Sequence, residues 1–199
     1  HIHALPFGVQ LDVVPLTADH RFDLAAFSEL LKLKPKVVSI SHVSNALGHI
    51  QPIADIVRLA KEAGALVVLD GAQGIVWEKV DVQALDVDFY LFSGHKLYGP
   101  TGIGVLYGKT QYLKLLRPLL GGGEMIKTVS FSGSSWNDLP YRLEAGTPNM
   151  AGAMGLAAAI LWLQQQDLTA FQQHKSALVQ RFYAGCQQIS ALELLSGPI

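Results

Sequence analysis

The sequence lacks the features that stabilise small secreted proteins or anchor proteins in membranes. Its 199 residues include one cysteine, Cys186, so no disulfide can form within the chain. No apolar run approaches the roughly 18 residues of a membrane-spanning helix. The first residues show no signal-peptide pattern. We therefore expect a protein of the reducing cytoplasm that does not bind membranes.

An excess of charge of either sign is also absent. The 15 Lys and Arg residues nearly balance the 16 Asp and Glu residues, giving a formal net charge of −1. The isoelectric point is about 6.7. Proteins that bind nucleic acid usually present a basic surface, which this composition does not favour. We expect no nucleic-acid partner.

Apolar residues make up 50% of the chain and charged residues only 16%. This composition indicates a globular α/β segment with a sizeable core. The mean hydropathy of +0.29 is high, so we expect some apolar surface to face further chain or a second subunit. Because the first residue is His1 and not Met, we expect an internal fragment of a longer protein.

Apolar patterning predicts alternating strands and helices. Asp23 is placed to cap a helix that ends by Pro35, and Pro52 to begin one that Gly64 ends. Residues 8–15 resemble a strand that reaches a loop, and the glycines and serines of 121–137 predict a mobile or ligand-wrapping loop. The remaining predicted strands are 37–40, 66–69, 86–92 and 102–107, the last antiparallel to its predecessor, and the remaining helices are 110–116, 150–165 and 168–189.

Two predicted strands end abruptly in polar side chains, Asp70 after one and Lys96 just past the other. Ligands of α/β proteins usually bind at such strand ends. A lysine beside a histidine and between glycines is suited to Schiff-base chemistry, and a carboxylate can pair with a cationic pyridine nitrogen. Taken singly, Lys96 fits a solvated loop and Asp70 an Asp-Gly turn. Together they predict a site for pyridoxal 5'-phosphate.

Three motifs carry a family resemblance. They are His42-Val43-Ser44-Asn45-Ala46-Leu47-Gly48, Asp70-Gly71-Ala72-Gln73, and the run from Ser93-Gly94-His95-Lys96 to Gly104. With them the chain resembles the class V aminotransferase superfamily, and more narrowly the cysteine desulfurases of the group that includes selenocysteine lyase-like enzymes. The resemblance is strongest between residues 41 and 149.

The resemblance implies an α/β fold, that of the fold type I pyridoxal-phosphate-dependent transferases, with a mostly parallel sheet and flanking helices. Residues 1–165 would belong to the cofactor-binding large domain, incomplete at its N-terminus. Residues 166–199 would form a long helix leading into a truncated C-terminal small domain. Lys96 would hold the cofactor and act as the catalytic proton shuttle, and Asp70 would keep the ring nitrogen protonated.

The same resemblance implies further cofactor-binding residues. Asn45 and Gln73 would lie at the phenolic oxygen, whereas alone they fit a loop turn and a surface glutamine. Ser93 and His95 would donate to the phosphate, although His95 also fits a packed histidine near a strand end. Thr147 would reach the phosphate of a partner subunit, which implies a homodimer, and its alternative is a helix-entry residue.

The implied reaction removes sulfur from L-cysteine, giving L-alanine and an enzyme persulfide whose sulfur passes to an acceptor protein for iron–sulfur cluster assembly or other sulfur transfer. The resemblance places the nucleophilic cysteine, the ring-stacking histidine and the main substrate-carboxylate arginine outside this chain. Cys186 lies in a run of helical spacing and is expected to be a packed thiol, and Arg142 is an open candidate for a carboxylate clamp.

Two other functions stay open. One is a different class V enzyme, such as a lyase acting on L-selenocysteine, an aminotransferase or an epimerase. The other is a non-catalytic dimerisation or scaffold remnant. No metal site is expected.

Overall fold

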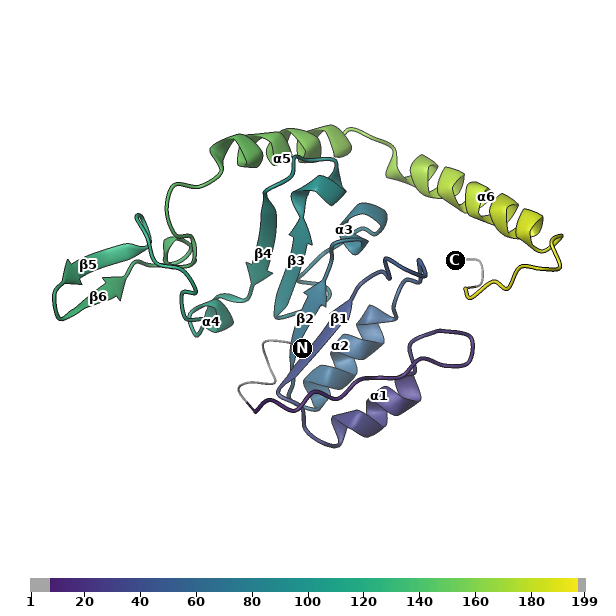
Figure 1. Cartoon of the computed structure of the whole chain (residues 1–199), viewed down its shortest axis with the longest axis horizontal. Coiled ribbons are helices and arrows are strands. Elements are labelled where there is room, and N and C mark those ends of the chain that lie inside the picture. The colour runs from purple at the N-terminus through teal and green to yellow at the C-terminus, as the bar shows by residue number, and fades with distance from the viewer. Residues whose placement is uncertain (1–7, 197–199) are drawn as a thin grey trace. The chain divides into compact units, whose positions relative to one another are not determined.

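The structure is a computed structural model, and it describes residues 8–196. Helices alternate with strands along the chain (Figure 1), so the predicted α/β class is confirmed. The chain divides into two compact units. The first runs to Val87 and resumes at Asp167, and the second comprises residues Asp88–Gln166. No helix within residues 8–196 has both the length and the apolarity needed to cross a membrane.

In the first unit, a helix connects two parallel strands, as the apolar pattern predicts. β1 (Val37–Ser41) pairs with β2 (Leu66–Asp70) in a register that sets Ser41 opposite Asp70. Both strands therefore end at the same edge of the sheet. The connecting helix α2 (Ile53–Glu62) buries one face, on which Ile56 is completely covered. Burying one such side chain stabilises the fold by about 1.5–3 kcal/mol.

Helix α1 (Leu24–Leu31) also belongs to this unit and packs against α2. Its N-terminus is capped as predicted, because the Ala26 N–H donates to the Asp23 carboxylate over 2.9 Å. Phe27 and Leu31 are buried. The helix ends at Leu31, earlier than the proline expected to end it.

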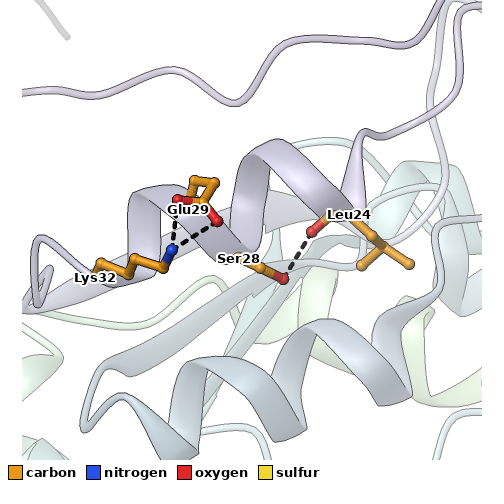
Figure 2. Close-up of polar contacts among 4 residues, drawn as sticks. All are labelled: Leu24, Ser28, Glu29 and Lys32. Carbon is orange, nitrogen blue, oxygen red and sulfur yellow. Dashed lines mark hydrogen bonds and ion pairs between the residues drawn. The ribbon is translucent and has the colours of Figure 1, made fainter.

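Helix α1 and the residue that follows it carry local polar contacts (Figure 2). The Lys32 ammonium contacts both carboxylate oxygens of Glu29 at 2.6 and 2.7 Å, and the Ser28 hydroxyl donates to the Leu24 carbonyl over 2.8 Å. The two charged side chains are 69% and 70% exposed. Exposed ion pairs contribute at most about 1 kcal/mol, so the cap and the buried face determine the stability of this helix.

The first unit is completed by α3 (Gly74–Trp77) and by α6 (Leu168–Cys186). Asp167 caps α6 by accepting from the Ala170 N–H over 3.0 Å. The predicted helix continues to 189, whereas α6 ends at Cys186. That thiol is free and partly exposed, less covered than the packed thiol expected from its helical spacing.

In the second unit, β3 (Phe89–Ser93) pairs antiparallel with β4 (Gly104–Gly108), which confirms the predicted direction. β3 begins later than predicted because Asp86 has a left-handed backbone, φ 53°, which a strand does not accommodate. Asp88, fully buried, pairs with Lys109 at 3.3 Å. The unit also contains η2 (Gly94–Leu97), α4 (Thr110–Leu113), η3 (Tyr141–Leu143) and α5 (Met150–Leu163).

Two sequence expectations were wrong. The segment 121–137 contains a hairpin in which β5 (Ile126–Ser130) pairs antiparallel with β6 (Gly133–Trp136). Glycine and serine have low strand propensity, and this composition hid the hairpin. Conversely, residues 8–15 form no strand, and the nearest pairing is a single bridge between Leu16 and Phe22.

Candidate active site

The loop after β1 is a tight turn that exposes Asn45. The Ser44 N–H donates to the His49 carbonyl over 2.9 Å, and the Gly48 N–H donates to the Ser44 carbonyl over 3.0 Å. Gly48 has φ +72°, a conformation that glycine adopts without strain. The turn therefore holds Asn45 on the surface just beyond the strand end.

The turn after β2 brings a second predicted residue to Asn45. Gln73 Nε2 donates to Asn45 Oδ1 over 2.5 Å, although the two residues are 28 positions apart. Asp70 is exposed, and its Oδ1 accepts from the Ala72 N–H over 2.9 Å. The turn role considered for Asp70 is therefore present. Its Oδ2 has no hydrogen-bond partner within residues 8–196, so the carboxylate can still accept from a ligand.

The buried residue His42 links the loop after β1 to the turn after β2. Its backbone N–H donates to the Asp70 carbonyl over 2.8 Å, and its side chain is only 6% exposed. A Cβ at Gly74 would lie 2.5 Å from the His42 ring, so only glycine fits there. Burial lowers the pKa of His42 below its ordinary value. A neutral, packed ring thus supports the segment that presents Gln73.

A cavity of about 270 Å³ opens beside Asn45 and Gln73. Two of its lining residues, Trp77 and Lys175, were not found by the sequence reasoning. Lys175 follows Gln73 by about a hundred positions and lies in a different helix, and no motif marks it. The lining residues are Val43, Ser44, Asn45, Gly48, Ile50, Gln73, Trp77 and Lys175.

The second unit places Ser93, His95 and Lys96 on consecutive backbone at the end of β3. The Gly94 N–H donates to the Ile103 carbonyl over 2.8 Å, and a Cβ on Gly94 would lie 2.8 Å from an Ile103 methyl group. Glycine is therefore required where the strand turns into η2. Lys96 is half-buried and has no hydrogen-bond or ion-pair partner within residues 8–196. The Ser93 hydroxyl is unpaired within the same range, and His95 is exposed.

The start of α5 packs onto this turn. The Asn149 side chain caps the helix by accepting from the Gly152 N–H over 2.9 Å, and it donates to the Gly102 carbonyl over 3.1 Å. Gly155 approaches Pro100 so closely that a Cβ would lie 3.0 Å from the ring. Thr147, two residues before the cap, is exposed.

Arg142 forms internal contacts that do not suit a carboxylate clamp. Its Nη2 donates to the Leu116 carbonyl over 3.1 Å, and its Nη1 lies 3.4 Å from the Lys114 carbonyl. The outer nitrogens of its planar fork thus already meet carbonyl oxygens. The structure therefore gives Arg142 the role of joining two segments of the second unit.

Each unit carries side chains that fit a part of pyridoxal phosphate. An unpartnered half-buried amine at Lys96 suits bond formation with an aldehyde, and the adjacent hydroxyl of Ser93 and imidazole of His95 are donors for a phosphate. The amide pair and the open Asp70 oxygen supply groups for a phenolic oxygen and a ring nitrogen. No cluster of three or more metal-ligating side chains occurs among the described residues.

The aminotransferase class-V family matches residues 4–198 of this chain. A probable cysteine desulfurase of Vibrio cholerae is 50% identical over 188 residues, which cover 94% of this chain and 46% of that protein. A cysteine desulfurase of Yersinia pestis is 47% identical over 192 residues, covering 96% and 47%. The chain thus spans about half the length of the curated relatives it matches.

Solved structures of similar proteins agree with this assignment. The Escherichia coli cysteine desulfurase CsdA matches with a TM-score of 0.86 and 42% identity over 92% of this chain and 47% of that one. A cysteine desulfurase from Thermococcus onnurineus matches with a TM-score of 0.87 and 38% identity, covering 93% and 46%. These neighbours confirm the predicted fold of pyridoxal-phosphate-dependent transferases. The chain belongs to the class-V aminotransferase family.

Proposed function

We propose that the protein containing this chain is a pyridoxal-phosphate-dependent cysteine desulfurase that converts L-cysteine to L-alanine and a protein-bound persulfide. The observation that carries the proposal is the Lys96 amine, half-buried and unpartnered within residues 8–196, directly after Ser93 and His95. The relatives named above are cysteine desulfurases. A similar C-DES variant, with a TM-score of 0.78 and 26% identity over 94% of this chain and 51% of that one, has glycine covalently linked to its PLP cofactor.

The residues of the two units have complementary roles in this proposal. Lys96 Nζ binds the cofactor covalently, and Ser93 and His95 donate to its phosphate. Asp70 Oδ2 accepts from the protonated ring nitrogen, for which it is available. The amides of Asn45 and Gln73, which are hydrogen-bonded to each other, would hold the phenolic oxygen.

When bound, pyridoxal phosphate supplies an aldehyde that reacts with amines and a ring that withdraws electrons from the substrate. Lys96 Nζ would accept and return the proton at the substrate Cα. Asp70 keeps its negative charge and holds the ring proton in place. The substrate sulfur is taken up by a cysteine outside this chain and then passes to an acceptor protein for iron–sulfur cluster assembly or other sulfur transfer.

The assembly proposed is a cytoplasmic homodimer. Its support is the exposed position of Thr147, two residues before the Asn149 cap. In the dimer, Thr147 donates to the cofactor phosphate of the partner subunit.

The test uses the whole protein with Lys96→Ala, and Lys114→Ala as a control at an exposed lysine of the same unit. We expect added pyridoxal phosphate to give a visible absorption band that Lys96→Ala loses and Lys114→Ala keeps. L-alanine formation from L-cysteine should follow the same pattern. A folded wild-type protein without a Lys96-dependent band would refute cofactor binding, and a band without L-alanine formation would refute the desulfurase assignment.

A further inference from the structure

The cavity beside Asn45 and Gln73 has a positive character. Among the residues that the structure describes, Lys175 is the one charged residue that lines it, and no carboxylate does. Three apolar side chains, those of Val43, Ile50 and Trp77, supply the rest of the wall with two amides and a hydroxyl. A cavity of this composition favours a small anion that also has a short aliphatic part.

Lys175 is held at the cavity by contacts with Trp77. Its Nζ lies 4.9 Å from the centre of the Trp77 ring, as in a cation–π interaction. Gln172, one turn earlier on the same face of α6, donates from Nε2 to the Trp77 carbonyl over 3.0 Å. Two contacts from one helix face therefore fix the position of this ammonium group.

The charge of Lys175 is not neutralised by a carboxylate of the described residues. The side chain is half-buried, and no ion pair joins it to a carboxylate within residues 8–196. A partly buried ammonium group loses part of its hydration free energy. Contact with a ring face recovers only some of this loss. An anion in the cavity would supply the missing partner.

A second donor lies on the same cavity wall. Gln73 Nε2 is directed to Asn45 Oδ1, which leaves the Nδ2 group of Asn45 as an available donor. A carboxylate has two acceptor oxygens and can accept from an ammonium and an amide together. The wall thus offers one charged and one neutral donor to a single carboxylate.

We propose that Lys175, supported by Trp77, binds a small carboxylate in this cavity, together with Asn45. That the carboxylate is that of the amino-acid substrate rests on the function proposed above. Lys175 is then a specificity residue supplied by this chain, additional to the arginine that the family resemblance places outside it.

Cofactor-free protein tests the proposal through the fluorescence of Trp77. Trp136→Phe and Trp162→Phe, both in the second unit, leave Trp77 as the one tryptophan of this chain, and any tryptophan elsewhere in the whole protein is replaced by Phe in the same way. Propionate and propionamide, which have the same shape but differ in charge, are titrated at constant ionic strength. We expect a saturable change with propionate that propionamide does not give, and a similar change with L-alanine.

Lys175→Met and Lys175→Gln should each weaken propionate binding by about tenfold or more, since a charge-assisted hydrogen bond is lost. Lys36→Met, at an exposed lysine that does not line the cavity, should bind as the parent does. Equal binding of propionate and propionamide, or unchanged binding by either folded Lys175 variant, would overturn the proposal. This measurement involves neither cofactor nor turnover, so its failure is distinct from failure of the Lys96 test.

Discussion

The side-chain amide of Gln73 donates to Oδ1 of Asn45, and this hydrogen bond joins the turn after β2 to the loop after β1. The two residues meet because β1 and β2 are parallel and end in register, with Ser41 opposite Asp70. The loops that follow therefore leave from one edge of the sheet. This edge is where ligands of α/β proteins usually bind.

The bond between the two amides predicts a measurable coupling. Asn45→Ala and Gln73→Ala should each lower the free energy of unfolding slightly, and the double variant should lose less than the sum. We expect a coupling of about 0.5–1 kcal/mol, as for a hydrogen bond open to solvent. Urea denaturation of the four proteins provides the cycle. Strict additivity would show that the bond contributes nothing to stability.

Gly74 should tolerate no side chain. In Gly74→Ala the new Cβ would meet the buried His42 ring at 2.5 Å, and overpacking of this kind costs about 1–3 kcal/mol. The matched control is Gly185→Ala in α6, where no atom of residues 8–196 lies within 4 Å of the added atom and alanine favours the helix. Urea midpoints compare the two variants. Equal stability of Gly74→Ala and wild type would mean that His42 is not packed against this position.

The buried His42 predicts a loss of stability in mild acid. Burial lowers its pKa in the folded protein from the ordinary value of 6.5, so the unfolded chain binds a proton more readily. The contribution of His42 is therefore complete above pH 6.5 and is lost as the pH falls toward the lower folded-state pKa. Unfolding in urea at pH 7.5 and 5.5 measures the difference.

His42→Gln should reduce this dependence on pH, whereas His95→Gln, a change at an exposed histidine, should leave it unchanged. The comparison depends on the slope with pH and not on absolute stability. A destabilised His42→Gln protein therefore still gives a result. An identical slope in wild type and His42→Gln would contradict the assignment of the pH effect to this ring.

Local chemistry explains which parts of the fold could be predicted from sequence. Asp23 caps its helix by a hydrogen bond to a residue three positions later, and Pro52 immediately precedes the first residue of α2. Each of these residues therefore lies within one turn of the helix end that it predicts. The predicted Asn45 and Gln73 meet because their strands have clear apolar patterns, from which a parallel pair and a shared edge follow.

The missed features depend on contacts between distant segments. Lys175 reaches Trp77 only after α6 has packed on α3, and the helix sequence has no motif for this contact. The hairpin of β5 and β6 depends on cross-strand pairing, in which glycine- and serine-containing β6 is aligned with β5, and the composition of β6 does not predict a strand. The sequence likewise does not show that Arg142 donates a hydrogen bond to the Leu116 carbonyl, because the two residues are 26 positions apart.

Asp70 has two candidate roles, one in the turn that contains Ala72 and one as a charged partner of the cofactor ring nitrogen. Replacing one carboxylate oxygen with an amide nitrogen separates them. In Asp70→Asn the side-chain carbonyl oxygen can still accept from the Ala72 N–H, which preserves the turn observed here. The charge that would hold a protonated ring nitrogen is lost. We expect the free energy of unfolding to change by less than about 0.5 kcal/mol. L-alanine formation by the whole protein should fall by about 100-fold or more, as when an aligned electrostatic partner is removed from a reaction site.

Asp70→Ala is the matched comparison, because it removes both the turn contact and the charge. It should lose activity to a similar extent and stability in addition, by about 0.5–1.5 kcal/mol for the lost hydrogen bond. Stability is measured on cofactor-free protein, so that cofactor binding does not contribute. If Asp70→Asn keeps full activity while Asp70→Ala loses stability, the carboxylate serves only the turn. If both variants lose activity and only Asp70→Ala loses stability, the negative charge of Asp70 serves the cofactor, and its Oδ1 contact with the Ala72 N–H stabilises the fold.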